Sequence, residues 1–226
     1  MPDLAKHSTN ATVVFLGNNG TGIEEYEKYI NPERILLGFP GAAGKRDKHV
    51  MRVVFDPEKS HITIGGPSGK FTARLYKIKN FFEEAGIPVI VSKNVDAWLK
   101  SHIALISPLA NAHYMLKSQN KSLLEATEIF DLVANAIIEG IIVLRKLHYP
   151  ILPKKLRLVR YAPKLLKKKI REIYTWKWFD IAMKGHADHA IDEMRQIAEE
   201  FQRLVKKSDI STPAINALYT SIPSPK

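Results

Sequence analysis

The chain has 226 residues, of which 45% are hydrophobic and 25% are charged, and its formal net charge is +11. This composition is typical of a globular protein with one large domain or two small ones. The absence of cysteine excludes disulfides, thiolate catalysis and cysteine-based zinc sites. No apolar run reaches the roughly 18 to 20 residues that a spanning helix requires, and the first residues do not resemble a signal peptide. We therefore expect a cytoplasmic protein without a membrane partner.

The first part of the chain, up to about residue 97, alternates between strand and helix patterns. The sequence predicts strands over residues 12–16, 35–39, 50–55, 61–64 and 87–91, and helices over 23–30 and 71–85. A turn at Asp56-Pro57 is expected to join the third and fourth strands, and Gly86 is expected to end the second helix. Such alternation predicts an α/β sheet.

A turn-rich loop, Gly17 to Gly22, follows the first predicted strand. Glycine lets backbone N–H groups approach an anion at such a position. Its glycines fall at i, i+3 and i+5, however, and the dinucleotide fingerprint Gly-x-Gly-x-x-Gly occurs nowhere in the chain. The loop alone is equally well explained as a tight turn.

After Trp98 the pattern becomes helical. Ser122 and Glu125 have the spacing of a capping box, which predicts a helix over 122–147, with apolar residues at three- and four-residue intervals. A second long helix is expected over 191–204, and a short one after Thr212-Pro213. We place the domain boundary near residue 97, giving an α/β domain (1–97) and an all-helical domain (98–226). The stripe over 122–147 is wider than a small domain needs, which predicts a homodimer through this helix.

Several polar residues are candidates for chemistry. Lys100 lies at the junction of the two halves, where a lysine in a cleft can donate a proton to a carbonyl oxygen, although an exposed structural lysine is the simpler interpretation. Asp180, Asp188 and Asp192 lie near the last long helix and are equally compatible with a polar helix face. His186 and His189 with Asp192 lack an established metal-binding spacing, so no metal site is predicted.

The positive charge is concentrated between residues 151 and 180. Ten Lys or Arg residues lie there against Glu172 and Asp180, so this segment carries a net charge of +8. Such a block can bind a phosphate-bearing ligand or nucleic acid, but a solvated helix face is the simpler explanation.

Four short stretches resemble ketopantoate reductases. They are Phe15–Glu25, with its Asn-Gly-x-Gly; Ala85–Val89, followed by Ser92-x-Asn94-Val95; Trp98-Leu99-Lys100, similar to the family's Trp-x-Lys; and Ser211–Tyr219. Their order is that of the family and covers nearly the whole chain. The resemblance implies a truncated Rossmann-like α/β half, without its first βαβ unit, followed by a helical ketopantoate-reductase-type domain.

The resemblance also implies an activity. Family members transfer a hydride from NADPH to a 2-keto acid, with a lysine as general acid. By position, this implies Lys100 and Asp188 as catalytic residues, Asn19 and Asp180 as substrate-binding residues, and Asn19 near the nicotinamide end of NADP. We expect the main cofactor-binding segment to be missing from this chain. The expected partners are a small keto acid and a second copy of the chain, with neither nucleic acid nor membrane.

The chain also departs from the family pattern. Ala104 and Pro108 stand where the family has asparagines four and eight residues after the lysine, Trp176 replaces a serine, and Asp188 is shorter than the family's glutamate. These changes predict an altered keto-acid pocket. Two other interpretations stay open: a non-catalytic dimerisation or binding remnant, and a basic module that binds anions or nucleic acid.

Overall fold

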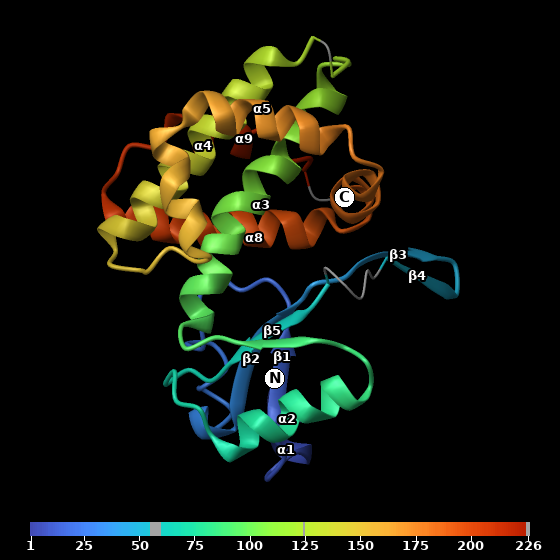
Figure 1. Ribbon diagram of the computed structural model, residues 1–226, viewed down its shortest axis with the longest axis vertical. Helices are drawn as coiled ribbons and strands as arrows, with labels where there is room; N and C mark the ends of the chain where they lie inside the picture. Colours follow the sequence, from blue (N-terminus) through green and yellow to red (C-terminus); the bar gives the residue numbers. More distant parts are fainter. Residues whose placement is uncertain (55–59, 124, 225–226) are drawn as a thin grey trace. The chain divides into compact units, whose positions relative to one another are not determined.

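The chain forms two compact units (Figure 1). The computed structural model describes residues 1–54, 60–123 and 125–224. The sheet unit comprises Met1–Ala42 and Phe55–Leu99, and the helical unit comprises Ala43–Val54 and Lys100–Lys226. The division between the units falls inside helix α3 (Val95–Ser118), two residues beyond the predicted boundary. Residues 43–54, which the sequence placed in the α/β domain, group with the helices instead.

The sheet unit is built on a four-stranded mixed sheet with the strand order β1-β2-β5-β6. Its strands are β1 (Val13–Leu16), β2 (Ile35–Pro40), β5 (Ile62–Gly65) and β6 (Val89–Val91). β1 pairs with β2 in parallel, β2 with β5 antiparallel, and β5 with β6 in parallel. The predicted α/β class is confirmed, because β-branched and leucine-rich runs form each of these strands.

Alternate residues of β2 bury opposite faces of this sheet, as the two-residue period of a strand requires. Leu36 packs on one face with Leu75 of α2 (Ala73–Glu84), whose first turn is capped where the Leu75 N–H donates to the Thr72 hydroxyl at 3.2 Å. Ile35 and Leu37 pack on the other face with the first turns of α3. The short helices α1 (Pro2–His7) and η1 (Pro32–Arg34) complete the unit.

Two predictions for the sheet unit were wrong. Residues 23–30 form hydrogen-bonded turns instead of a helix: Tyr26 and Glu27 both donate to the carbonyl of Ile23, mixing three- and four-residue spacings. The strands at 50–55 and 61–64 do not form a hairpin with each other. β4 (Val50–Val54) pairs with β3 (Ala43–Asp47), a polar strand that the sequence pattern missed, while β5 joins the main sheet. The Asp56-Pro57 turn lies outside the described residues.

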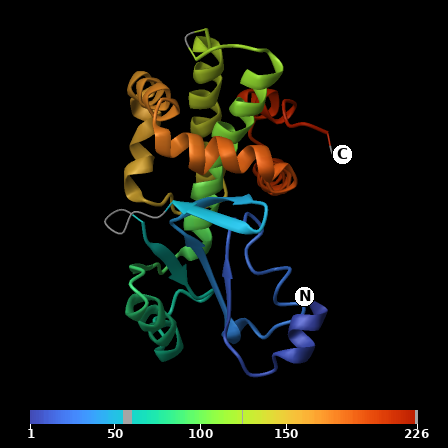
Figure 2. The same ribbon diagram turned by 90° about the vertical axis from the view of Figure 1, so that its right-hand side faces the viewer.

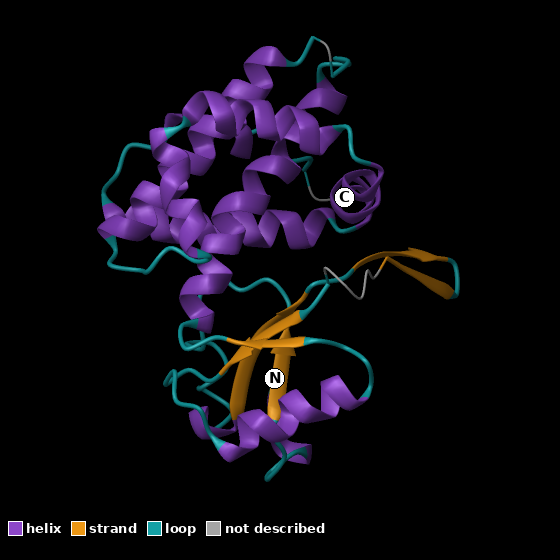
Figure 3. Ribbon diagram, in the orientation of Figure 1, coloured by secondary structure: helices purple, strands orange, loops and turns teal. Residues whose placement is uncertain are grey.

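The helical unit contains most of the helices that the structure describes. Figure 3 shows that its described residues are helical or looped apart from the β3–β4 ribbon. The helices of this unit are the last nineteen residues of α3, α4 (Thr127–Lys146), η2 (Lys154–Tyr161), α5 (Pro163–Tyr174), α6 (Lys177–Phe179), the π-helical η3 (Asp180–Gly185), α7 (His186–His189), α8 (Ile191–Ser208) and α9 (Pro213–Tyr219). No helix in the described ranges is both long and apolar enough to cross a bilayer.

Helix α4 is the centre of the helical core (Figure 2). The predicted apolar stripe is fully buried: Phe130, Val133, Ile137, Ile141 and Leu144. Gly140 permits close packing here, since an added Cβ would lie 3.1 Å from the Cβ of Ala104 and 3.3 Å from Phe201 Cζ. α4 begins at Thr127, later than predicted, although Ser122 N–H does donate to the Glu125 carboxylate at 3.0 Å in the preceding turn. The basis for a dimer through this helix was wrong, because the stripe is covered within the unit.

Candidate active site

A cavity of about 120 Å³ lies in the sheet unit, where β1 ends beside the middle of β2. Leu37 and Leu99 line it together with Phe15 and Tyr26, whose rings are stacked with centroids 3.9 Å apart. The carboxyl ends of strands are the usual ligand-binding edge of an open α/β sheet. The volume is close to that of cavities that accept a small aromatic ring, roughly 150 Å³.

Asn19 closes the loop that borders this cavity. Its side-chain N–H donates to the Gly22 carbonyl at 2.7 Å, and its side-chain oxygen accepts from the Gly22 N–H at 2.6 Å. Gly22 adopts a φ of +79°, which glycine tolerates without strain. The predicted ligand residue therefore lines the cavity, but both of its amide atoms hold the loop in shape.

Replacing Asn19 with alanine is expected to destabilise the protein by about 1–3 kcal/mol, since two buried backbone groups of Gly22 lose their partner. Chemical denaturation measures this cost. Asn31→Ala is the matched control, because the side chain of Asn31 is exposed and accepts a hydrogen bond from Glu33 N–H. Equal stability of Asn19→Ala and the unmodified protein would contradict this role for Asn19.

Lys100 begins the helical unit and directly follows Leu99, a wall residue of the sheet-unit cavity. Its side chain is 2% exposed, and its ammonium lies 4.9 Å from the centroid of the Tyr149 ring. The face of an aromatic ring attracts a cation. The hydroxyl of Ser101 fixes the same region by accepting from the Leu152 N–H at 3.1 Å. The expectation of an exposed structural lysine was wrong, and Tyr149 is a partner that the sequence did not indicate.

His102 lies two residues further along α3. Burial lowers its pKa to about 4, because the charged imidazolium loses hydration. The imidazole is therefore neutral near pH 7.

Asp188 contacts two side chains of α3, those of Lys117 and His113. Its Oδ1 lies 2.8 Å from Lys117 Nζ and 3.0 Å from His113 Nε2, both near the C-terminal end of α3. The neighbouring Tyr114 hydroxyl donates to the Ala187 carbonyl at 2.7 Å. Partial burial alone would raise the pKa of Asp188, but the hydrogen bonds from Lys117 and His113 outweigh it and lower the pKa. Asp188 thus links α7 to α3 through its contacts with Lys117 and His113.

The structure does not bring Asp188 to Lys100. Lys100 and His113 are thirteen positions apart in one helix, which corresponds to about 20 Å at 1.5 Å per residue. The side chains of lysine and aspartate cannot bridge that distance. The resemblance implied both Lys100 and Asp188 as catalytic residues; the structure separates them along α3 and pairs Asp188 with His113 and Lys117.

The ion pair of Asp188 predicts a dependence of stability on pH. Because its folded-state pKa is lowered, the pair stabilises the fold above the unfolded value near 3.9 and loses this effect as the pH falls through the folded value. For a pair with 35% of the aspartate side chain exposed, Asp188→Asn should cost at most about 1 kcal/mol at neutral pH. Urea unfolding across the acid range should show the difference vanish; a difference that persists unchanged at the lowest pH would refute it.

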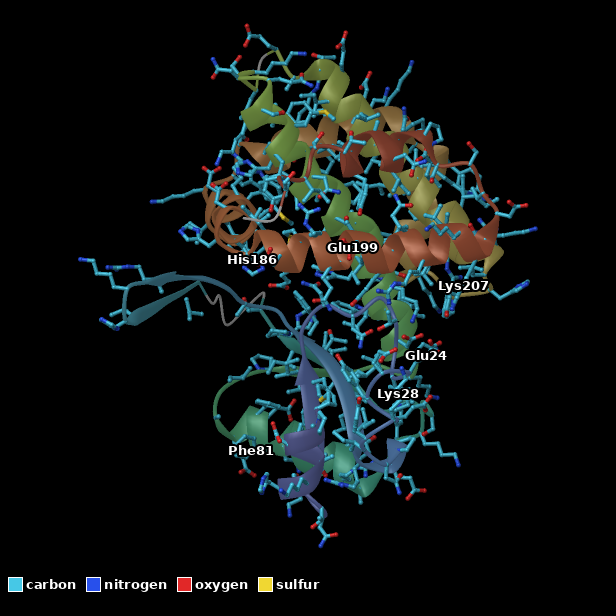
Figure 4. The ribbon with its side chains drawn as sticks, turned by 180° about the vertical axis from the view of Figure 1, so that it is seen from behind. Glu24, Lys28, Phe81, His186, Glu199 and Lys207 are labelled. Atoms are coloured by element: carbon cyan, nitrogen blue, oxygen red, sulfur yellow. The ribbon has the colours of Figure 1, made fainter. Side chains whose placement is uncertain are left out.

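Asp180, the other predicted carboxylate, lies at the start of η3. It is paired with Lys184 at 2.5 Å, and the Lys184 ammonium also donates to the Tyr174 carbonyl at 3.1 Å. Figure 4 labels His186, the first residue of α7, whose Nε2 lies 3.1 Å from a carboxylate oxygen of Glu193. Within the described ranges, no group of three His, Asp or Glu side chains is arranged to hold a metal ion.

A second cavity, of about 10 Å³, lies inside the helical unit between α3, α8 and α9. Such a volume suits about one water molecule. Ala104 and Pro108 line it, together with Ser107 and Asn111 from the same face of α3. Asn111 is 4% exposed, and its side-chain oxygen has no hydrogen-bond partner among the described residues. No spacing rule in the sequence distinguished these two polar residues.

The comparisons with known proteins concern the fold. No protein-family model matches the sequence, and no curated protein is significantly similar to it. Among solved structures, D-mandelate dehydrogenase in complex with NADH superposes with a TM-score of 0.72 at 13% identity, covering 97% of this chain and 72% of its own. The 2-dehydropantoate 2-reductase of Porphyromonas gingivalis W83 gives a TM-score of 0.65 at 15% identity, covering 95% and 64%. The chain has the ketopantoate reductase fold.

A third structure is the ketopantoate reductase from Staphylococcus aureus, described as dimeric. It superposes with a TM-score of 0.61 at 13% identity and covers 97% of this chain and 71% of its own. The chain thus spans roughly two thirds of these enzymes' length. The resemblance noted in the sequence is confirmed at the level of the fold, including its sheet unit and its helical ketopantoate-reductase-type unit.

Proposed function

We propose that the protein is an NADPH-dependent oxidoreductase that reduces a 2-keto acid to a 2-hydroxy acid, with Lys100 as the proton donor. The observation that carries this proposal is the buried side chain of Lys100, whose ammonium lies over the Tyr149 ring within the helical unit. The shared fold with ketopantoate reductases and with an NADH-bound D-mandelate dehydrogenase supports the reaction class.

The residues present fit one end of the cofactor. The aromatic-walled cavity beside Asn19 has the size and position for a nicotinamide ring, whereas the Gly-x-Gly-x-x-Gly turn that binds a pyrophosphate is absent from these 226 residues. When bound, the nicotinamide supplies the hydride. Asn19 would hold the loop that borders the ring, and the stacked rings of Phe15 and Tyr26 would exclude water from it.

Lys100 would protonate the substrate oxygen as the ketone becomes an alcohol. A positioned acid of this kind is expected to accelerate the reaction by about 10²- to 10⁴-fold. The Tyr149 ring would hold the ammonium. We assign no catalytic role to Asp188 and keep Asp180 only as a candidate substrate contact. Because Ala104 and Pro108 replace polar residues of the family, we propose a keto acid with an apolar substituent.

A steady-state assay tests the proposal. The protein would be incubated with NADPH, or with NADH, and with a panel of 2-keto acids whose substituents run from methyl to phenyl. We expect oxidation of the cofactor with at least one apolar keto acid, and faster turnover with NADPH. Absence of turnover with the whole panel at millimolar cofactor would overturn it.

Cofactor affinity is expected to be weak for these 226 residues alone. Without the glycine-rich turn, the pyrophosphate loses its backbone N–H donors and the positive end of a helix. Isothermal titration should give a dissociation constant for NADPH weaker than about 100 μM, which is in the upper part of the roughly 1 μM to 1 mM range of KM values for ordinary enzyme substrates. A value of about 1 μM or tighter, competed by NADP, would show that the cofactor binds elsewhere.

We also propose that the protein forms a homodimer, which the dimeric state of the S. aureus reductase supports. The interface would not involve the buried stripe of α4. Sedimentation at tens of micromolar, a usual range for detecting association, distinguishes a dimer from a monomer.

A further inference from the structure

The basic segment of the helical unit, residues 154–178, combines two properties that the proposed reductase does not use. It contains all ten Lys and Arg residues that give the 151–180 stretch its net charge of +8. Between these cations stand five large hydrophobic side chains that are 45–69% exposed: Leu158, Tyr161, Leu165, Trp176 and Trp178. Isolated exposed hydrophobics are ordinary, but five within 21 residues are not.

The inner side of this segment is packed into the core of the helical unit. On α5, Ile170 and Tyr174 are buried, and Tyr174 contacts Phe130 of α4 with ring centroids 5.1 Å apart. Lys167 on the flank pairs with Asp131 of α4 at 3.1 Å. Leu165 lies on the outer face of the helix, at 65% exposure, and so contributes nothing to the core.

The exposed hydrophobics are rimmed by cations. Lys168 and Lys169 stand three and four positions after Leu165, on the same side of α5. The Lys169 ammonium lies 5.2 Å from the Trp176 ring centroid. In η2, Leu158 and Tyr161 share one side because a 3₁₀-helix has three residues per turn. We call the exposed side chains of residues 154–178, the five hydrophobics together with the Lys and Arg side chains, the basic–apolar face.

The net positive charge of this face and its exposed hydrophobics together indicate which class of partner it binds. Two copies of the chain would not pair through this face, because a twofold interface would oppose two strongly positive surfaces. Nucleic acid would use the cations and the aromatic rings, but exposed leucines gain little from phosphates or base edges. An anionic bilayer interacts with the cations, the aromatic rings and the leucines alike. Its headgroups attract Lys and Arg, while Trp, Tyr and Leu enter the boundary between headgroups and acyl chains.

We propose that the basic–apolar face docks the protein reversibly on a membrane surface rich in anionic lipids. The proposal is independent of the reductase activity. It replaces the sequence-based expectation of no membrane partner, which considered spanning helices and signal peptides.

Vesicle co-sedimentation tests the proposal on the intact protein. One set of vesicles would contain phosphatidylcholine alone, and the other about 30% phosphatidylglycerol, an anionic fraction that gives a negative surface potential. We expect binding to the anionic vesicles only, weaker at high salt, with a blue shift of tryptophan emission from Trp176 and Trp178. Leu158→Ser combined with Leu165→Ser should weaken binding by about tenfold or more at unchanged charge.

Matched controls remove changes of similar kind elsewhere. Phe81→Ser removes a side chain on α2 that is 65% exposed, and Lys206→Gln with Lys207→Gln removes two exposed charges from α8; Figure 4 marks Phe81 and Lys207. Both controls should bind like the unmodified protein. Should the leucine variant not fold, Lys168→Gln with Lys169→Gln takes its place, again with an expected loss of about tenfold.

Three outcomes would overturn the proposal. The first is no binding to anionic vesicles. The second is binding that the leucine variant keeps in full, which would reduce the face to a simple electrostatic patch. The third is tighter binding to a single-stranded oligonucleotide than to the vesicles, with loss in the same variants, which would make nucleic acid the partner.

Discussion

Lys100→Met is expected to lower kcat/KM for the keto acid by about 10²- to 10⁴-fold, the usual contribution of a positioned general acid. Methionine keeps most of the buried stem against Tyr149 but removes the ammonium. The KM for NADPH should change little, because the ammonium addresses the substrate oxygen. Steady-state kinetics at millimolar cofactor measures both constants.

The variant also separates catalysis from stability. Lys100 is 2% exposed, so Lys100→Ala would leave a cavity and is expected to destabilise the fold by about 2 kcal/mol, whereas Lys100→Met should stay within about 1.5 kcal/mol of the unmodified protein. Lys117→Met, at the other end of α3, is the matched control and should retain activity. Full activity of Lys100→Met would exclude Lys100 as the donor.

Phe130→Ala is expected to destabilise the helical unit by about 3–5 kcal/mol, because the large buried ring leaves a cavity that the surrounding helices cannot fill. Phe130 is 2% exposed and lies against Tyr174, which in turn contacts Phe179 with centroids 4.7 Å apart and donates to the Leu109 carbonyl at 2.5 Å. Urea unfolding followed by helical circular dichroism measures the loss.

Ile142→Ala on the same helix is the matched control. Its side chain is 38% exposed, so the expected change is below about 1 kcal/mol. A loss of less than 1 kcal/mol in Phe130→Ala would mean that the aromatic cluster does not form the centre of the core.

The fold was predicted best where a pattern of side chains repeats along one element. The apolar stripes of α4 and α8 predicted their buried faces, and the Thr212-Pro213 pair predicted the start of α9. These features are local, since helical periodicity and the fixed φ of proline act within a few residues. Gly86 likewise has the positive φ expected after α2, at +78°.

The failures occurred where distant contacts decide the local structure. Residues 23–30 have helical spacing, but the segment is too short to form a stable helix alone, and burial of Ile30 against the sheet is satisfied by turns. β3 is polar, so its pairing with β4 left no alternating pattern to detect. For the same reason, the sequence could not link Asp188 to His113, 75 positions away, or show Lys100 beneath Tyr149.

Hydride transfer itself gives the most direct test of the central claim. The protein would be incubated with NADPH that carries deuterium at the transferable position of its nicotinamide and with the preferred apolar 2-keto acid, and the product would be analysed by mass spectrometry. The account predicts a 2-hydroxy acid that carries the deuterium, formed in equal amount to NADP and at a rate about 10²- to 10⁴-fold lower in Lys100→Met. A hydroxy acid without deuterium, or one formed equally fast by Lys100→Met, would contradict it.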